Sequence, residues 1–114
     1  MALTRDFRQT VADRARRDPA FARALLHEAA GLLINGEPGP ARLVLRDLVN
    51  ASIGFETLAT TVGRPSKSLH RMLSGRGNPS MDNLAAIFGT LCRELRVKLA
   101  VESGSPPRHP RRAA

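Results

Sequence analysis

Apolar residues in the first third of the chain recur every three or four positions, which is the spacing of one face of an α-helix. The first row consists of Leu3, Phe7, Val11 and Ala15. Asp18-Pro19 ends this row, because proline suits the first turn of a helix and not its interior. The pattern then resumes and predicts a second helix over residues 19–34. The chain therefore begins with two consecutive helices.

Further helices are predicted beyond a loop. Residues 35–40 read Asn-Gly-Glu-Pro-Gly-Pro, a composition typical of loops. Helical spacing then predicts a helix over residues 41–52 and two short helices over residues 55–62 and 66–74. Ser80 offers an N-cap to a last helix. Its inward-facing residues are Leu84, Ile87, Phe88 and Leu91. These elements together predict a mainly α fold.

The stretch 94–102 fits two kinds of element. Leu and Val alternate with Arg, Lys and Ala over residues 95–101, as in a half-buried strand. Leu91, Leu95 and Leu99 also fit one face of a helix. We favour a C-terminal strand, because the β-branched residues fall on one side of the alternation. A lone strand leaves its backbone groups unpaired, so it predicts pairing with the same strand of a second protomer or with another protein's sheet edge.

Composition narrows the classes of partner. The 114 residues suit one domain with tails. Four Phe with no Trp or Tyr argue against binding of single-stranded nucleic acid, which uses aromatic stacking platforms. The net charge of +8 favours a polyanionic partner. A GC-rich genome would also enrich arginine and alanine, so the position of the charge matters more than its amount.

Catalytic and metal-binding patterns are missing from the sequence. Cys92 is the only cysteine, which excludes an internal disulfide and a cysteine-based zinc site. His27, His70 and His109 lie far apart and lack the spacing of metal ligands. No nucleophile–base pair or paired-carboxylate site is recognisable, so we expect no metal, no cofactor and no enzymatic activity.

The sequence also predicts where the protein is located in the cell and which part of the chain is disordered. No segment approaches the about 20 apolar residues that a membrane span needs. The N-terminus lacks the apolar core of a signal peptide. We therefore expect a cytoplasmic protein that does not bind membranes. The tail 103–114 is rich in Pro and Arg, which predicts disorder.

The two short helices and the loop after them form a candidate DNA-binding unit. Gly63 lies between the helices, where glycine can adopt the left-handed conformation that ends a helix. Leu69 and Met72 are expected to face the core. The outward-facing residues are then Ser66, Lys67, Ser68 and Arg71. A helix-turn-helix places its second helix in the major groove of double-stranded DNA in this way. Two short helices joined at a glycine also occur in helical domains that never bind DNA.

Charge supports the DNA-binding interpretation. Residues 57–81 contain no Asp or Glu. The basic residues in the same stretch are Arg64, Lys67, Arg71 and Arg76. A run of one sign on the second helix and the following loop is typical of a phosphate-binding surface.

The region from Asp18 to Val101 resembles the lambda-repressor-like (Xre-type) helix-turn-helix proteins, and is similar to the HigA-like addiction-module antidotes. The resemblance rests on Asp18-Pro19, Gly54, Leu58-Ala59, Gly63, residues 68–74 (Ser-Leu-His-Arg-Met-Leu-Ser) and Gly77-Asn78-Pro79. Pro65 departs from the Ser or Thr that commonly caps the second helix, so the cap is expected to shift to Ser66. His70 stands where an aromatic residue is frequent in the HigA-like group.

The resemblance implies a dimeric antitoxin that neutralises a RelE/ParE-type toxin and represses its own operon. It places Ser66, Lys67, Ser68 and Arg71 at base edges, with Arg64 and Arg76 on phosphates. His70, on the same helix, completes the candidate DNA-binding residues. The expected division is an N-terminal helical extension over residues 1–40, a helix-turn-helix domain over residues 41–102 and a basic tail over residues 103–114. A free-standing Xre-type repressor and a protein-interaction module without specific DNA binding are the alternatives.

Overall fold

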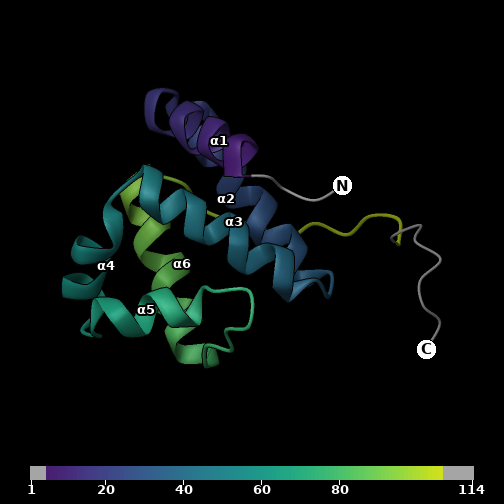
Figure 1. The fold of residues 1–114 in the computed structure, drawn as a ribbon. Coiled ribbons are helices and arrows are strands. Elements are labelled where there is room, and N and C mark those ends of the chain that lie inside the picture. Colours follow the sequence, from purple (N-terminus) through teal and green to yellow (C-terminus); the bar gives the residue numbers. More distant parts are fainter. Residues whose placement is uncertain (1–4, 107–114) are drawn as a thin grey trace.

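The structure of the chain is a computed structural model, which describes residues 5–106. The helices within this range are α1 (Arg5–Arg17), α2 (Pro19–Ile34), α3 (Pro38–Ala51), α4 (Gly54–Val62), α5 (Ser66–Met72) and α6 (Met81–Leu95). Figure 1 shows α1 lying across one end of a bundle formed by the other helices. The predicted mainly α fold is confirmed.

The break between the first two helices falls where the sequence predicts it. α1 ends at Arg17, and α2 begins at Pro19. The Asp18 carboxylate accepts hydrogen bonds from the backbone N–H groups of Ala20 and Phe21, at 3.1 and 3.3 Å. Asp18 therefore caps α2 by supplying an acceptor to N–H groups that have no partner inside the helix.

The third helix begins earlier than predicted. α3 starts at Pro38 instead of residue 41, so the loop predicted over residues 35–40 shortens to residues 35–37. Proline reads as a loop residue in sequence, yet its fixed φ and missing N–H suit the first turn of a helix. Gly36, with a φ of 89°, makes the turn between α2 and α3 in the left-handed region.

One hydrophobic core joins the helices. α2 packs along α3, and α1 contacts both of them (Figure 1). The largest fully buried side chains are Leu26, Leu45, Leu48, Val49, Leu58, Leu69, Leu73, Ile87 and Leu91. They lie in α2 to α6 or, for Leu73, directly after α5, so the core reaches both sides of residue 40. The proposed boundary at residue 40 stays a prediction.

A half-buried ion pair fixes α1 on α3. The Arg8 guanidinium contacts the Asp47 carboxylate through two hydrogen bonds, Nη2–Oδ1 at 2.9 Å and Nε–Oδ2 at 3.3 Å. The hydrogen bond to Asp47 raises the pKa of Arg8 above its ordinary value, against the opposing effect of burial. This paired geometry sets the orientation of α1 as well as its position.

The strand predicted over residues 94–102 is not present in the described chain. Residues 94 and 95 are the last turn of α6. Arg96 then takes the left-handed conformation, with a φ of 58°, and the Val97 N–H bonds the Cys92 carbonyl at 2.9 Å. Residues 97–106 are neither helix nor strand. The helix cap turns the chain away, and the described residues contain no second strand to pair with it.

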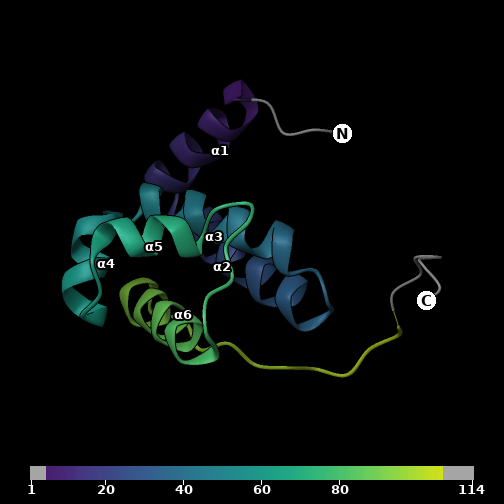
Figure 2. The same cartoon turned by 60° about the horizontal axis from the view of Figure 1, so that its bottom comes forward.

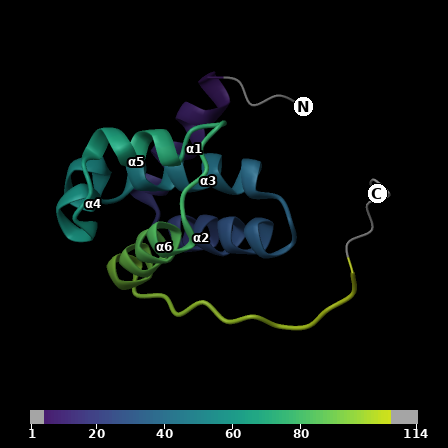
Figure 3. The same cartoon turned by 90° about the horizontal axis from the view of Figure 1, so that it is seen from below.

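The alternation predicted for this stretch holds for the side chains of residues 97–100, but not for Val101, which is 79% exposed. Val97 and Leu99 pack against the core, whereas Lys98 and Ala100 are exposed. In Figure 3 this segment and α5 lie on opposite sides of the molecule. Residues 107–114, which include His109 and most of the predicted disordered tail, lie outside the described residues. No helix among the described residues has the length and apolar character to cross a bilayer.

Candidate nucleic-acid interface

The connection between α4 and α5 is a tight turn that depends on Gly63. Its φ and ψ of 70° and 35° lie in the left-handed region, as predicted. The N–H groups of Gly63 and Arg64 both bond the Ala59 carbonyl, at 2.9 and 3.2 Å. Glycine adopts this conformation without the steric penalty that a β-carbon brings. The turn therefore fixes where α5 begins relative to α4.

The start of α5 differs from the expectation in one detail. Pro65 occupies the N-cap position, and no side chain caps the helix there. Ser66 does not take over this role, because it is already the first residue inside the helix. The Pro65 carbonyl still accepts the first helical hydrogen bond, from the Leu69 N–H at 3.1 Å. Proline thus supplies the backbone angle for entry into α5 without a capping hydroxyl.

Two buried leucines hold α5 against the core. Leu69 and Leu73 are fully buried, and Met72 is half-buried. Lys67, His70 and Arg71 on the outer side of α5 are exposed. Ser66 and Ser68 are half-buried, so they are less exposed than predicted. Figure 2 shows α5 on the outside of the molecule, where a large partner can reach it.

His70 has a packing contact in addition to its exposure. Its ring stacks on Phe55 of α4, with centroids 3.8 Å apart and planes 22° from parallel. The imidazole therefore replaces the aromatic residue that the resemblance leads one to expect. It links the two helices of the candidate unit at their outer side.

The basic residues divide into one that is held and three that are free. Arg64 Nε donates to Asn83 Oδ1 of α6 at 3.2 Å. The side chains of Lys67, Arg71 and Arg76 make no hydrogen bond or ion pair with any described residue. Three unpaired cations near one helix attract a polyanion without first breaking an internal contact.

A residue not predicted from the sequence, Arg42, positions the loop after α5. Arg42 of α3 donates from Nε to the Ser74 carbonyl at 3.0 Å and from Nη2 to the Gly75 carbonyl at 2.9 Å. Figure 2 shows this loop passing α3 before the chain enters α6. The two bonds satisfy carbonyls that follow the end of α5. These carbonyls belong to the two residues directly before Arg76. No local signal identifies Arg42, because its partners lie 32 and 33 residues away.

Gly77 brings the same loop into close contact with the end of α5. A β-carbon on Gly77 would overlap the backbone carbonyl of Met72 and would lie 2.6 Å from the Arg71 carbonyl oxygen. Gly75, two residues earlier, has open space around it. Only glycine fits at position 77, which gives a physical reason for one part of the Gly-Asn-Pro motif.

The described residues contain no group of three or more His, Cys, Asp and Glu side chains placed to hold a metal ion. Comparison of the chain with protein-family models, curated proteins and solved structures gives no match. The residues themselves and the motif resemblance described above are therefore what indicates a function.

Proposed function

We propose that the protein is a sequence-specific DNA-binding transcriptional regulator, with α4 and α5 acting as a helix-turn-helix. The observation that supports this most is the set of unpaired cations at Lys67, Arg71 and Arg76 on a firmly anchored helix and loop. Leu69 and Leu73 fix the helix from below, so its outer residues reach a partner in a defined orientation.

The proposal assigns different tasks to these residues. Arg71 reads a base edge, because a guanidinium can bond guanine O6 and N7 together. Lys67, Ser66, Ser68 and His70 lie on the same helix and contribute contacts to bases or backbone. Arg64 and Arg76 flank the helix and bind phosphates, which position the protein without reading sequence.

The first test is a fluorescence-anisotropy titration of the full chain. The DNA is a duplex from upstream of its own gene, compared with a scrambled duplex of equal length, at several salt concentrations. We expect tighter binding to the native duplex and an affinity that falls steeply with salt, because phosphate contacts release counterions. Equal, weak binding to both duplexes would instead favour a protein-interaction module with a basic surface.

Replacement of Arg71 separates base recognition from general charge. Arg71→Ala should weaken binding to the native duplex by about 5- to 150-fold, the range expected for one bidentate base contact. Binding to the scrambled duplex should change much less. Arg23→Ala is the matched control, since Arg23 is an exposed arginine of α2 without a polar partner among the described residues. Equal losses for both variants would contradict the role given to Arg71.

The resemblance extends the proposal to an antitoxin that represses its own operon together with a RelE/ParE-type toxin. A neighbouring gene for a small basic protein, whose toxicity this chain suppresses on co-expression, would support that role. Lack of suppression together with specific operator binding would favour the free-standing repressor.

A further inference from the structure

The segment that follows α6 is an extended chain with an open edge. Its backbone N–H and C=O groups from residue 98 to residue 106 make no hydrogen bond with any described residue. One side of the segment is held, because Val97 and Leu99 pack against the core. An extended chain fixed on a protein surface with free backbone groups is a template for a second strand.

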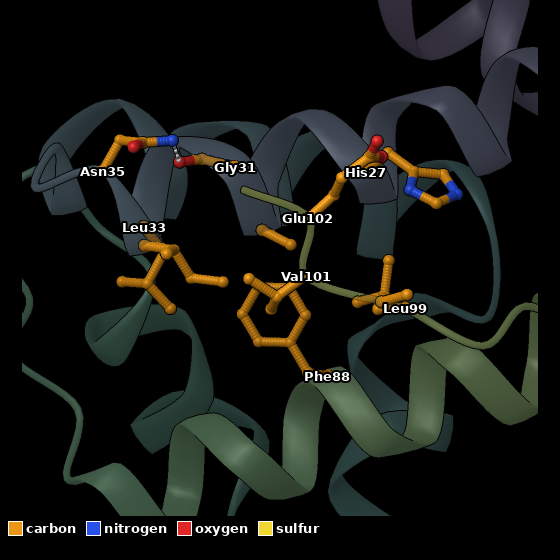
Figure 4. A pocket seen from close by; sticks show the side chains of 11 residues that line it. His27, Gly31, Leu33, Asn35, Phe88, Leu99, Val101 and Glu102 are labelled. Carbon is orange, nitrogen blue, oxygen red and sulfur yellow. Dashed lines mark hydrogen bonds between the residues drawn. The ribbon is translucent and has the colours of Figure 1, made fainter. Parts of the chain in front are cut away.

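Apolar side chains surround this edge. Figure 4 shows Leu99 and Val101 between α2, which contributes Leu33 and Gly31, and Phe88 of α6. The groove has a volume of about 350 Å³. Val101 remains 79% exposed, and Ile34, which lines the same groove, is 60% exposed. The chain thus leaves an apolar surface uncovered directly beside unpaired backbone.

The charges along the segment indicate what covers it. Lys98 and Glu102 are exposed and have no ionic partner among the described residues. They lie two residues before and two residues after Ala100. In an antiparallel pair, residues directly opposite each other lie on the same face of the sheet. A second copy of the segment, centred on Ala100, therefore places Lys98 of each chain opposite Glu102 of the other.

We propose that residues 97–102 of two copies pair as antiparallel strands about a two-fold axis at Ala100. This register forms two identical Lys98–Glu102 pairs, and it places Leu99 opposite Val101 of the second copy on the groove side. A symmetric interface of this kind uses the same patch on both protomers. Shifting the centre to residue 99 leaves Lys98 opposite Ala100, and it places Glu102 opposite Arg96, which is left-handed and not extended.

The dimer would add what the single chain lacks. Backbone pairing satisfies the open edge, and the strand is already supported by α2 and α6, unlike an isolated two-stranded ribbon. Since α5 lies on the opposite side of each protomer (Figure 3), the pairing leaves the candidate DNA-binding helix accessible. The inference does not depend on DNA binding, and its test uses no DNA.

Charge reversal tests the register. The mass of the full chain is measured by sedimentation equilibrium over a wide range of concentration for the unaltered protein, Lys98→Glu, Glu102→Lys and the double reversal. Each single reversal replaces two attractive pairs by two repulsive pairs, so we expect the dimer dissociation constant to rise about tenfold. The double reversal should restore the original value.

Glu56→Lys changes the net charge as Glu102→Lys does, but on exposed α4, and should leave the dissociation constant unchanged. A protein that remains monomeric at all concentrations would overturn the proposal. So would a dimer in which the double reversal is no tighter than the single reversals, because its interface would then lie elsewhere.

Discussion

The α5 region and the segment 97–102 both carry groups without a partner in the described chain, but the groups differ in kind. Beside α5 they are the cationic side chains of Lys67, Arg71 and Arg76. At the segment they are backbone N–H and C=O groups beside apolar side chains. Unpaired cations attract a polyanion, whereas an open backbone edge accepts another polypeptide. The molecule therefore offers two surfaces of different chemistry on opposite sides (Figure 3).

The two regions also differ in how firmly the chain fixes them. The loop after α5 is held by two hydrogen bonds from Arg42 and by the close contact at Gly77. The segment beyond Val97 is held by side-chain packing alone. A surface that reads DNA needs its side chains in place beforehand, while an edge strand gains its order when a second strand pairs with it. The following substitutions separate these two cases.

The largest effect is expected at Gly77. Gly77→Ala should lower the free energy of unfolding by more than about 3 kcal/mol, because the added methyl group overlaps backbone atoms at the end of α5 that cannot rotate away. Thermal denaturation followed by circular dichroism measures the loss. Gly75→Ala is the matched control, since position 75 has open space, and it should change stability little. Similar stability of both variants would show that the loop does not pack closely on α5.

A smaller effect is expected when the loop loses its anchor. Arg42→Lys keeps the charge but lacks the planar guanidinium that bonds both carbonyls. The free energy of unfolding should therefore fall by about 1–2 kcal/mol. Affinity for the native duplex should fall several-fold, because Arg76 is then less well positioned. The slope of affinity against salt should stay unchanged, since no cation has been removed. Arg46→Lys on the same helix is the control, and an equal effect there would remove the anchoring role from Arg42.

The sequence predicted most of what depends on neighbouring residues. The helix break at Asp18-Pro19, the left-handed Gly63 and the cap at Ser80 follow from local chemistry, and the structure has each of them. The start of α3 was missed because Pro38 has the same local signal in a loop and in the first turn of a helix. The long-range bonds of Arg42 leave no pattern in sequence at all.

The segment 95–101 shows where pattern and structure separate. Alternation correctly predicted which side chains face the core over residues 97–100, since Val97 and Leu99 are packed and Lys98 and Ala100 are exposed. It failed at Val101, which it places on the inner side and which is exposed. It could not decide whether a strand forms, because a strand is defined by hydrogen bonds to a neighbour and not by its own residues. The same limit holds for the proposed DNA-binding residues, since their exposure and charge allow a contact that only the partner completes.

The smallest effect on folding, and the sharpest contrast within one segment, is expected at Val101. Val101→Ser should change the free energy of unfolding at low concentration by less than about 0.5 kcal/mol, because the side chain is 79% exposed. Val97→Ser, on the same face of the segment but packed against the core, should cost about 1–2 kcal/mol. For the dimer dissociation constant, measured by sedimentation equilibrium, the order of the two variants should be reversed. Val101→Ser should raise this constant several-fold, because two apolar cross-strand pairs with Leu99 are lost. If Val101→Ser leaves self-association unchanged, the exposed valine is an ordinary surface residue, and the open edge does not bind a second copy in the register centred on Ala100.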